Sequence, residues 1–80
     1  MTRYYFNIQD GQTIHDEEGM EINDMQSVKN EAVRASLELL KGLQDPEFWA
    51  GVPWRLWVSD QPNGAGNTVM TLTFSARLAG

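Results

Sequence analysis

The sequence predicts an α+β domain in which one helix packs on one face of an antiparallel sheet of four main strands. Residues 3–8 alternate apolar with polar side chains, as a half-buried strand does. Residues 25–41 carry apolar side chains at spacings of three and four, the pattern of an amphipathic helix. Two more alternating segments follow, with a loop rich in Pro, Asn and Gly between them. The element order is therefore ββαββ, with room for one extra short strand.

The segment before the helix is expected to hold short strands. Arg3–Ile8 forms the first, and the Asp-Gly pair that follows is a turn signal because Gly reaches positive φ without steric strain. Thr13–Asp16 is expected as the second strand, with Ile14 directed inward. Met20–Ile22 is the possible extra strand. These elements together form the N-terminal part of the sheet.

The helix is expected over Met25–Lys41. Asp24 suits the N-cap, because its carboxylate can accept from free N–H groups of the first turn and favours the positive end of the helix dipole. Gly42 suits the left-handed residue that often closes a helix. The apolar stripe that faces the sheet consists of Met25, Val28, Ala32, Ala35, Leu39 and Leu43.

A linker and a long hairpin follow the helix. Pro46–Ala50 is predicted as a single helical turn, since Pro is favoured at the first helical position. Its Phe48 and Trp49 are expected to cover the end of the core, because leaving both exposed is unfavourable. The remaining strands are expected at Trp54–Ser59 and Thr68–Arg77, joined by the loop 60–67.

One helix covers one face of a sheet, so the alternation also predicts which side chains lie on the open face. The helix-facing side chains are Tyr4, Phe6, Ile8, Trp54, Leu56, Val58, Met70, Leu72 and Phe74. The open face holds Arg3, Tyr5, Asn7, Arg55, Trp57, Ser59, Thr71, Thr73, Ser75 and Arg77. Arg, Tyr and Trp are enriched where interfaces gain most of their energy. The candidate contact residues are therefore Arg3, Tyr5, Arg55, Trp57 and Arg77.

Three interpretations of this face stay open. It can be an ordinary solvated sheet face, where Thr and Arg are common. It can be a homodimer or protein-partner interface, which the Arg and aromatic composition favours. It can also hold single-stranded nucleic acid or another anionic ligand, because aromatic side chains beside Arg bind single strands. The net charge of −5 disfavours nucleic acid.

The length and composition bound the class of protein. Eighty residues suit one domain spanning 1–80, and a chain this short has a marginal core. There is no Cys to form disulfides, so association with a partner subunit is the most accessible way for this small domain to gain stability. No long apolar run or secretory signal is visible, so we expect a cytoplasmic protein without membrane contact.

The sequence does not indicate catalysis. Residues 1–24 carry six acids and one base, but the acids lack the alternate spacing of a calcium loop, so they are expected to be a solvated rim and a helix cap. His15 is the only His, and the sequence has no Cys and no Ser in a nucleophile motif that it could activate as a general base. A metal-assisted activity at His15 and Asp16 is the weakest alternative. The glycines of the 60–67 loop precede a strand, whereas a phosphate-binding loop opens a helix. We expect no enzyme, no cofactor and no metal site.

The N-terminal motif resembles a family of small proteins of unknown function from rhizobia and related alphaproteobacteria. The resemblance rests on Arg-Tyr-Tyr-Phe-Asn-Ile at 3–8, an Asp-Gly turn, Asp-Glu-Glu-Gly-Met-Glu at 16–21, and Asp24 before an Ala-containing helix. It covers essentially the whole chain. The aromatic pair at 48–49 and the long 60–67 loop depart from the family pattern. The resemblance implies the same fold and supplies no activity, ligand or site residue.

Overall fold

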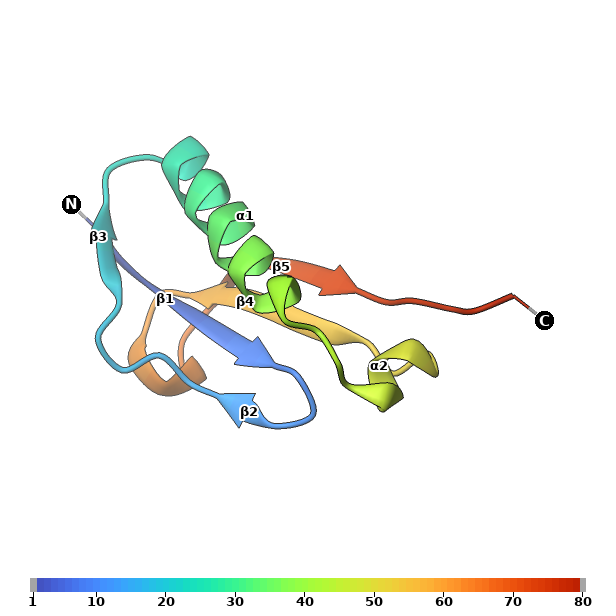
Figure 1. The fold of residues 1–80 in the computed structure, drawn as a ribbon. Helices are drawn as coiled ribbons and strands as arrows, with labels where there is room; N and C mark the ends of the chain where they lie inside the picture. Colours follow the sequence, from blue (N-terminus) through green and yellow to red (C-terminus); the bar gives the residue numbers. More distant parts are fainter. Residues whose placement is uncertain (1, 80) are drawn as a thin grey trace.

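A computed structural model describes residues 2–79 and shows a five-stranded antiparallel sheet with one long helix on one face (Figure 1). The α+β class predicted from the sequence is confirmed. The strands are β1 (Thr2–Gln9), β2 (Thr13–Ile14), β3 (Met20–Ile22), β4 (Trp54–Ser59) and β5 (Thr68–Phe74). The helices are α1 (Met25–Lys41), the single turn α2 (Pro46–Trp49) and the 3₁₀ turn η1 (Pro62–Gly64).

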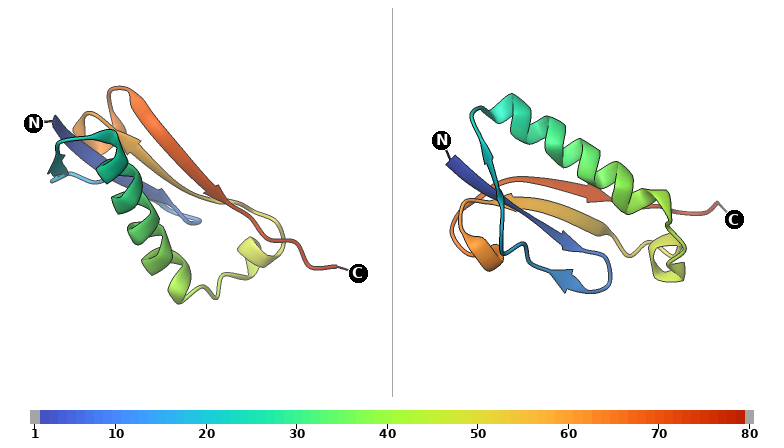
Figure 2. Two further views of the ribbon diagram at one scale, coloured as in Figure 1. Left: turned by 90° about the horizontal axis from the view of Figure 1, so that it is seen from above. Right: turned by 60° about the vertical axis from the view of Figure 1, so that its left-hand side comes forward.

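The strand order, which the sequence left open, is β2-β1-β4-β5. The short strand β3 pairs with the N-terminal half of β1, on the same edge where β2 pairs with its C-terminal half. The register aligns Phe6 with Val58 and Val58 with Met70, so the predicted core residues share one face. β5 forms the other edge of the sheet, as two further views show (Figure 2).

The helix α1 begins as the sequence predicts. The Asp24 carboxylate accepts from the Ser27 N–H at 2.8 Å. Val28 and Ala32 are fully buried and pack in one cluster with Leu56 and Val58. Complete burial of four apolar side chains makes this cluster the centre of the core.

Three details of α1 differ from expectation. Met25, in the first turn of α1, is 42 % exposed rather than packed in the core. Ser36 is buried instead, which is possible because its hydroxyl donates to the Ala32 carbonyl at 2.7 Å. Gly42 has φ of −109°, so the predicted left-handed closure was wrong. Residues other than Gly also adopt this backbone conformation.

The turn α2 closes one end of the core with one of its two aromatic residues. Phe48 is buried against Trp54, with 5.2 Å between ring centroids. Trp49 is 44 % exposed, so the prediction that both rings cover the core holds for Phe48 only. Asp45 fixes the turn, because its carboxylate accepts from the Glu47 N–H at 3.0 Å and from the Trp54 indole at 3.2 Å.

Two strands are shorter than predicted. β2 ends at Ile14 rather than Asp16, and Ile14 is 52 % exposed instead of inward. β5 ends at Phe74 rather than Arg77, and the chain beyond it runs past the sheet (Figure 1). β5 ends because its partner β4 begins at Trp54, opposite Phe74. β2 ends although β1 continues, because the Asp16 carboxylate accepts from the Phe6 N–H and the Asn7 side chain accepts from the Asp16 N–H, so side chains replace the backbone pairing.

Candidate functional site

The face of the sheet away from α1 divides into two halves. Cross-strand rows run through Asn7, Trp57 and Thr71, and through Gln9, Arg55 and Thr73. A third row contains Tyr5, Ser59 and Thr68. Alternation along the strands places these side chains on one face. The chain covers part of this face, so the predicted open face is only half open.

The covered half lies around Asn7 and Ser59, which are both fully buried. Asn7 Nδ2 donates to Ser59 Oγ at 3.0 Å, and Asn7 Oδ1 accepts from the Asp16 N–H at 3.0 Å. The Asn63 N–H in η1 in turn donates to the Asp16 carbonyl at 3.1 Å. The prediction that Asn7 and Ser59 lie on a free surface was wrong, because the segment after β2 and the turn η1 fold over them.

Asp16 is the centre of this covering segment. One carboxylate oxygen accepts from the Phe6 N–H at 3.0 Å, and the other accepts from the Glu18 and Gly19 N–H groups at 3.1 Å each. An ionised carboxylate with three backbone donors is firmly held. Asp16 is therefore structural and not part of a solvated rim. Within residues 2–79, no group of three or more His, Asp or Glu side chains is placed to hold a metal ion.

Gly19 allows the covering segment to approach the sheet. It has φ of +70°, and a Cβ there would lie 2.7 Å from the Tyr5 ring and 2.8 Å from the Tyr4 carbonyl oxygen. Both the backbone conformation and the lack of space require glycine. The Asp-Glu-Glu-Gly part of the N-terminal motif is thus explained by a tight turn packed on Tyr5.

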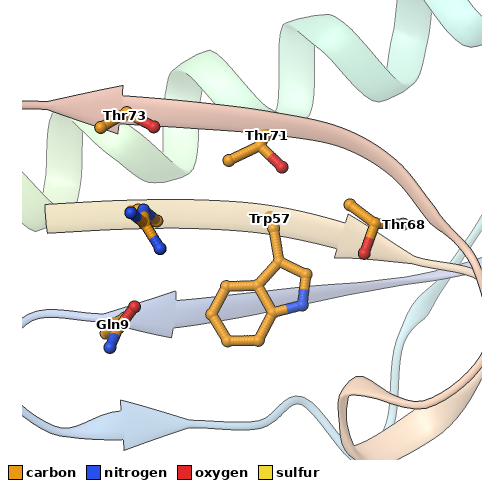
Figure 3. Close-up of a pocket in the computed structure, with 6 residues that line it drawn as sticks. Gln9, Trp57, Thr68, Thr71 and Thr73 are labelled. Carbon is orange, nitrogen blue, oxygen red and sulfur yellow. The ribbon is translucent and has the colours of Figure 1, made fainter.

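The uncovered half is a shallow hollow of about 440 Å³ (Figure 3). Its lining residues are Gln9, Arg55, Trp57, Thr68, Thr71 and Thr73. The Trp57 ring lies across it and meets His15 edge to face, with 5.9 Å between centroids and an 89° angle between planes. Arg55 is exposed and forms no ion pair within residues 2–79. The hollow therefore combines a cation, an aromatic ring and hydroxyl groups.

The structure brings together two of the five predicted contact residues, Arg55 and Trp57. Arg3 is engaged elsewhere, since its guanidinium donates to the Glu18 carbonyl at 2.7 Å and pairs with Glu21 at 3.5 Å. Tyr5 lies against Gly19. Arg77 follows the end of β5 at Phe74, so its predicted place on the last strand was wrong.

Sequence reasoning missed two residues of the hollow. Side chains alternate between the two faces along a strand, which puts Gln9 on the open face with Asn7, but β1 was expected to end at Ile8. Thr68 reaches this face because a bulge between Val58 and Ser59 shifts the register, so that Val58 opposes Met70 while Ser59 opposes Thr68. The alternation could therefore have predicted Gln9, whereas no feature of this sequence indicates the bulge.

Fold and surface together define the class: a small α+β domain with one helical layer and a partly uncovered sheet face. Residues 3–75 match the family DUF6894, described as a domain of unknown function. The chain belongs to this DUF6894 family. No curated protein and no solved structure matches the chain.

The family assignment confirms the expected relation to proteins without an assigned function, and it indicates no catalytic family. The bacterial source and the specific N-terminal motif stay predictions. Among residues 2–79, no helix has the length and apolar character needed to cross a bilayer.

Proposed function

We propose that this chain is a non-catalytic interaction module that associates with a second copy of itself. The supporting observation is the balance of buried and exposed apolar side chains. Within the described residues, seven hydrophobic residues are buried and nine large ones are at least 36 % exposed. Small domains with so thin a core gain stability when a partner covers apolar surface.

The sequence places this contact on the open face, and that location stays a prediction. The hollow around Arg55 and Trp57 is the part of this face that the chain leaves uncovered. Its six lining residues include one cation and no acid. A face-to-face contact centred on the hollow would place the Arg55 guanidinium of each copy in the interface without a carboxylate from the hollow to pair with it, which is unfavourable.

Light scattering coupled to size exclusion tests self-association directly. At about 200 μM we expect a species of about twice the 9.0 kDa chain mass. A wild-type chain that stays monomeric at this concentration would disprove the proposal. Trp57→Ala tests the location, because loss of the dimer in this variant would place the contact on the open face.

The second candidate function is binding of single-stranded nucleic acid or another anionic ligand in the hollow. Arg55 favours it, since this guanidinium has no acidic partner within residues 2–79 and lies beside Trp57. An aromatic ring beside Arg lets a base stack while the cation meets a phosphate. Six of the eleven acids lie in residues 1–24, outside the hollow.

Tryptophan fluorescence with a single-stranded oligonucleotide at low and high salt tests this candidate. Quenching that weakens with salt is expected, and Trp57→Phe should abolish it because Trp49 and Trp54 lie outside the hollow. Arg55→Ala should reduce the affinity, whereas Lys41→Ala removes the same charge from α1 and should change it much less. The absence of quenching at low salt would exclude nucleic acid as the ligand.

A further inference from the structure

The outer edge of β5 is open for pairing with another strand. β5 is the last strand in the order β2-β1-β4-β5, and its outer side faces no other strand of the described chain. Its seven residues, Thr68–Phe74, include no charged residue and no Pro. Charged residues and Pro are features that proteins commonly use to prevent edge pairing, and neither protects this edge.

We propose that a second copy of this chain pairs with β5 in antiparallel fashion, so that the two sheets become one continuous sheet. This inference rests on the proposed self-association and assigns it a surface, the β5 edge rather than the open face. Twofold symmetry places the same strand on both sides of the contact.

The register of this pair follows from the two faces of the sheet. Paired residues must lie on the same face, because a slip of one residue would place apolar side chains opposite polar ones. The bulge near Val69 leaves Met70–Phe74 as the regular run of β5. Its central residue is Leu72. In this register Leu72 meets its symmetry copy on the helix side, and Thr71 meets Thr73 on the open side.

The helix α1 presents apolar side chains toward the same edge. Ser27 and Glu31 line a separate pocket together with residues of β3, so this side of α1 faces β3. The opposite side of α1 is therefore directed toward β5. Val33 and Leu40 lie on that opposite side by helical spacing. Val33 is 52 % exposed, and Leu40 lines a groove of about 620 Å³ together with Phe74. Pairing along β5 would bring these apolar side chains of the two copies toward one another.

The area required for a stable dimer explains why both parts of this surface are needed. A typical interface buries roughly 800 Å² per partner, or roughly 15 % of the 5387 Å² surface of this chain. One short strand edge buries less than this. The apolar side of α1 and the groove beside Phe74 supply additional surface next to the strand.

The charge distribution also favours the β5 edge. The six acids of residues 1–24 lie on or next to β1, β2 and β3, on the far side of the sheet from β5. Contact through β5 therefore keeps the acidic segments of two copies apart. Contact through the β2 and β3 edge would bring them together, and like charges across an interface are destabilising.

The proposed dimer leaves the hollow accessible and extends its surface. Thr68, Thr71 and Thr73 of β5 line the hollow from one side (Figure 3). Pairing at β5 places two such hollows on one continuous face. Arg55 and Trp57 of both copies would then be available to a single extended ligand.

Disulfide cross-linking tests the register, since the chain has no natural cysteine. Residues directly opposite in an antiparallel pair lie within disulfide distance. Oxidised Leu72→Cys is expected to run as a covalent dimer. Ile14→Cys, at the opposite edge, serves as the control and should stay mostly monomeric. Equal cross-linking of the two variants would overturn the register.

A second pair of variants tests the surface without changing β5. Val33→Lys is expected to give a monomer by light scattering, whereas Ile14→Lys, equally 52 % exposed, should leave the dimer intact. A monomeric wild type would refute self-association itself. A wild-type dimer that survives Val33→Lys and is lost in Trp57→Ala would overturn the β5 surface and leave self-association standing.

Discussion

The two edges of the sheet differ in length, charge and covering. The edge of β1 is occupied by two short strands, β2 with two residues and β3 with three, and the segment between them carries Asp16, Glu17 and Glu18. The edge of β5 has seven uncharged residues. Short pairing and acidic side chains block the addition of another strand, whereas a long neutral strand permits it.

This comparison changes the meaning of the acidic N-terminal segment. Asp16 accepts three backbone hydrogen bonds and holds the segment across the sheet, so its charge serves the fold. The edge that it closes is not available for association. Available surface is then found at the hollow and at the β5 edge. His15 contacts Trp57 beside the hollow, whereas β5 lies at the opposite edge of the sheet from the acidic segment.

The largest effect is expected from Asp16→Ala. Removal of the carboxylate leaves the N–H groups of Phe6 and Gly19 without their acceptor, which we expect to lower the free energy of unfolding by about 3 kcal/mol. Urea denaturation measures the loss. Glu17→Ala is the control, since Glu17 is an exposed neighbour. Equal stability of the two variants would contradict the structural role of Asp16.

A smaller loss is expected from Gly19→Ala. The added Cβ would meet the Tyr5 ring in a left-handed backbone conformation, and we expect a loss of about 2 kcal/mol. Gly42→Ala is a matched control, because Gly42 has φ of −109° and a Cβ added there would meet no atom within 4 Å. Thermal unfolding should show a lower Tm for the first variant only. A wild-type Tm in Gly19→Ala would show that the turn can relax.

The β5 edge should respond to protein concentration, whereas the opposite edge should not. Hydrogen exchange of the outward amides in Met70–Phe74 is expected to slow about tenfold or more when the concentration rises through the dimer range. The amides of Thr13 and Ile14 provide the internal comparison. Exchange at β5 that is independent of concentration would argue against pairing at this edge.

The smallest effect on stability is expected from the ion pair between Glu31 and Arg34 on α1. The hydrogen bond from Arg34 lowers the pKa of Glu31 below its usual value. The contribution of the Glu31–Arg34 pair to stability is therefore present above the unfolded-state pKa of Glu31 near 4.5. It is lost as the pH falls through the lower folded-state pKa. The stability difference between wild type and Arg34→Ala should be detectable at neutral pH and vanish in acid. A difference that persists in acid would assign it to packing.

Much of the fold could be predicted because it depends on local patterns. The helix bounds, the Asp24 cap and the strand Trp54–Ser59 agree with the structure, since periodicity and capping act within a few residues. The largest boundary errors are those of Thr13–Asp16 and Thr68–Arg77. The first depends on side-chain bonds of Asp16 and Asn7 that replace backbone pairing with β1, and the second on where β4 begins. The local pattern records neither contact.

The candidate site was predicted less completely for the same reason. Arg55 and Trp57 share a strand, so alternation alone places them on one face. Arg3 and Tyr5 have the right parity, but the chain after β2 returns to contact them. Parity specifies the side of a sheet and gives no information about which segments fold over it.

The sequence by itself determined the class of fold, the helix with its cap, and the two faces of the sheet, because these follow from side-chain spacing along a continuous segment. Only the tertiary structure decided the strand order, the burial of Asn7 and Ser59, and the contrast between the two edges. These depend on contacts between segments far apart in the chain, whose geometry is set by the packing of the whole domain.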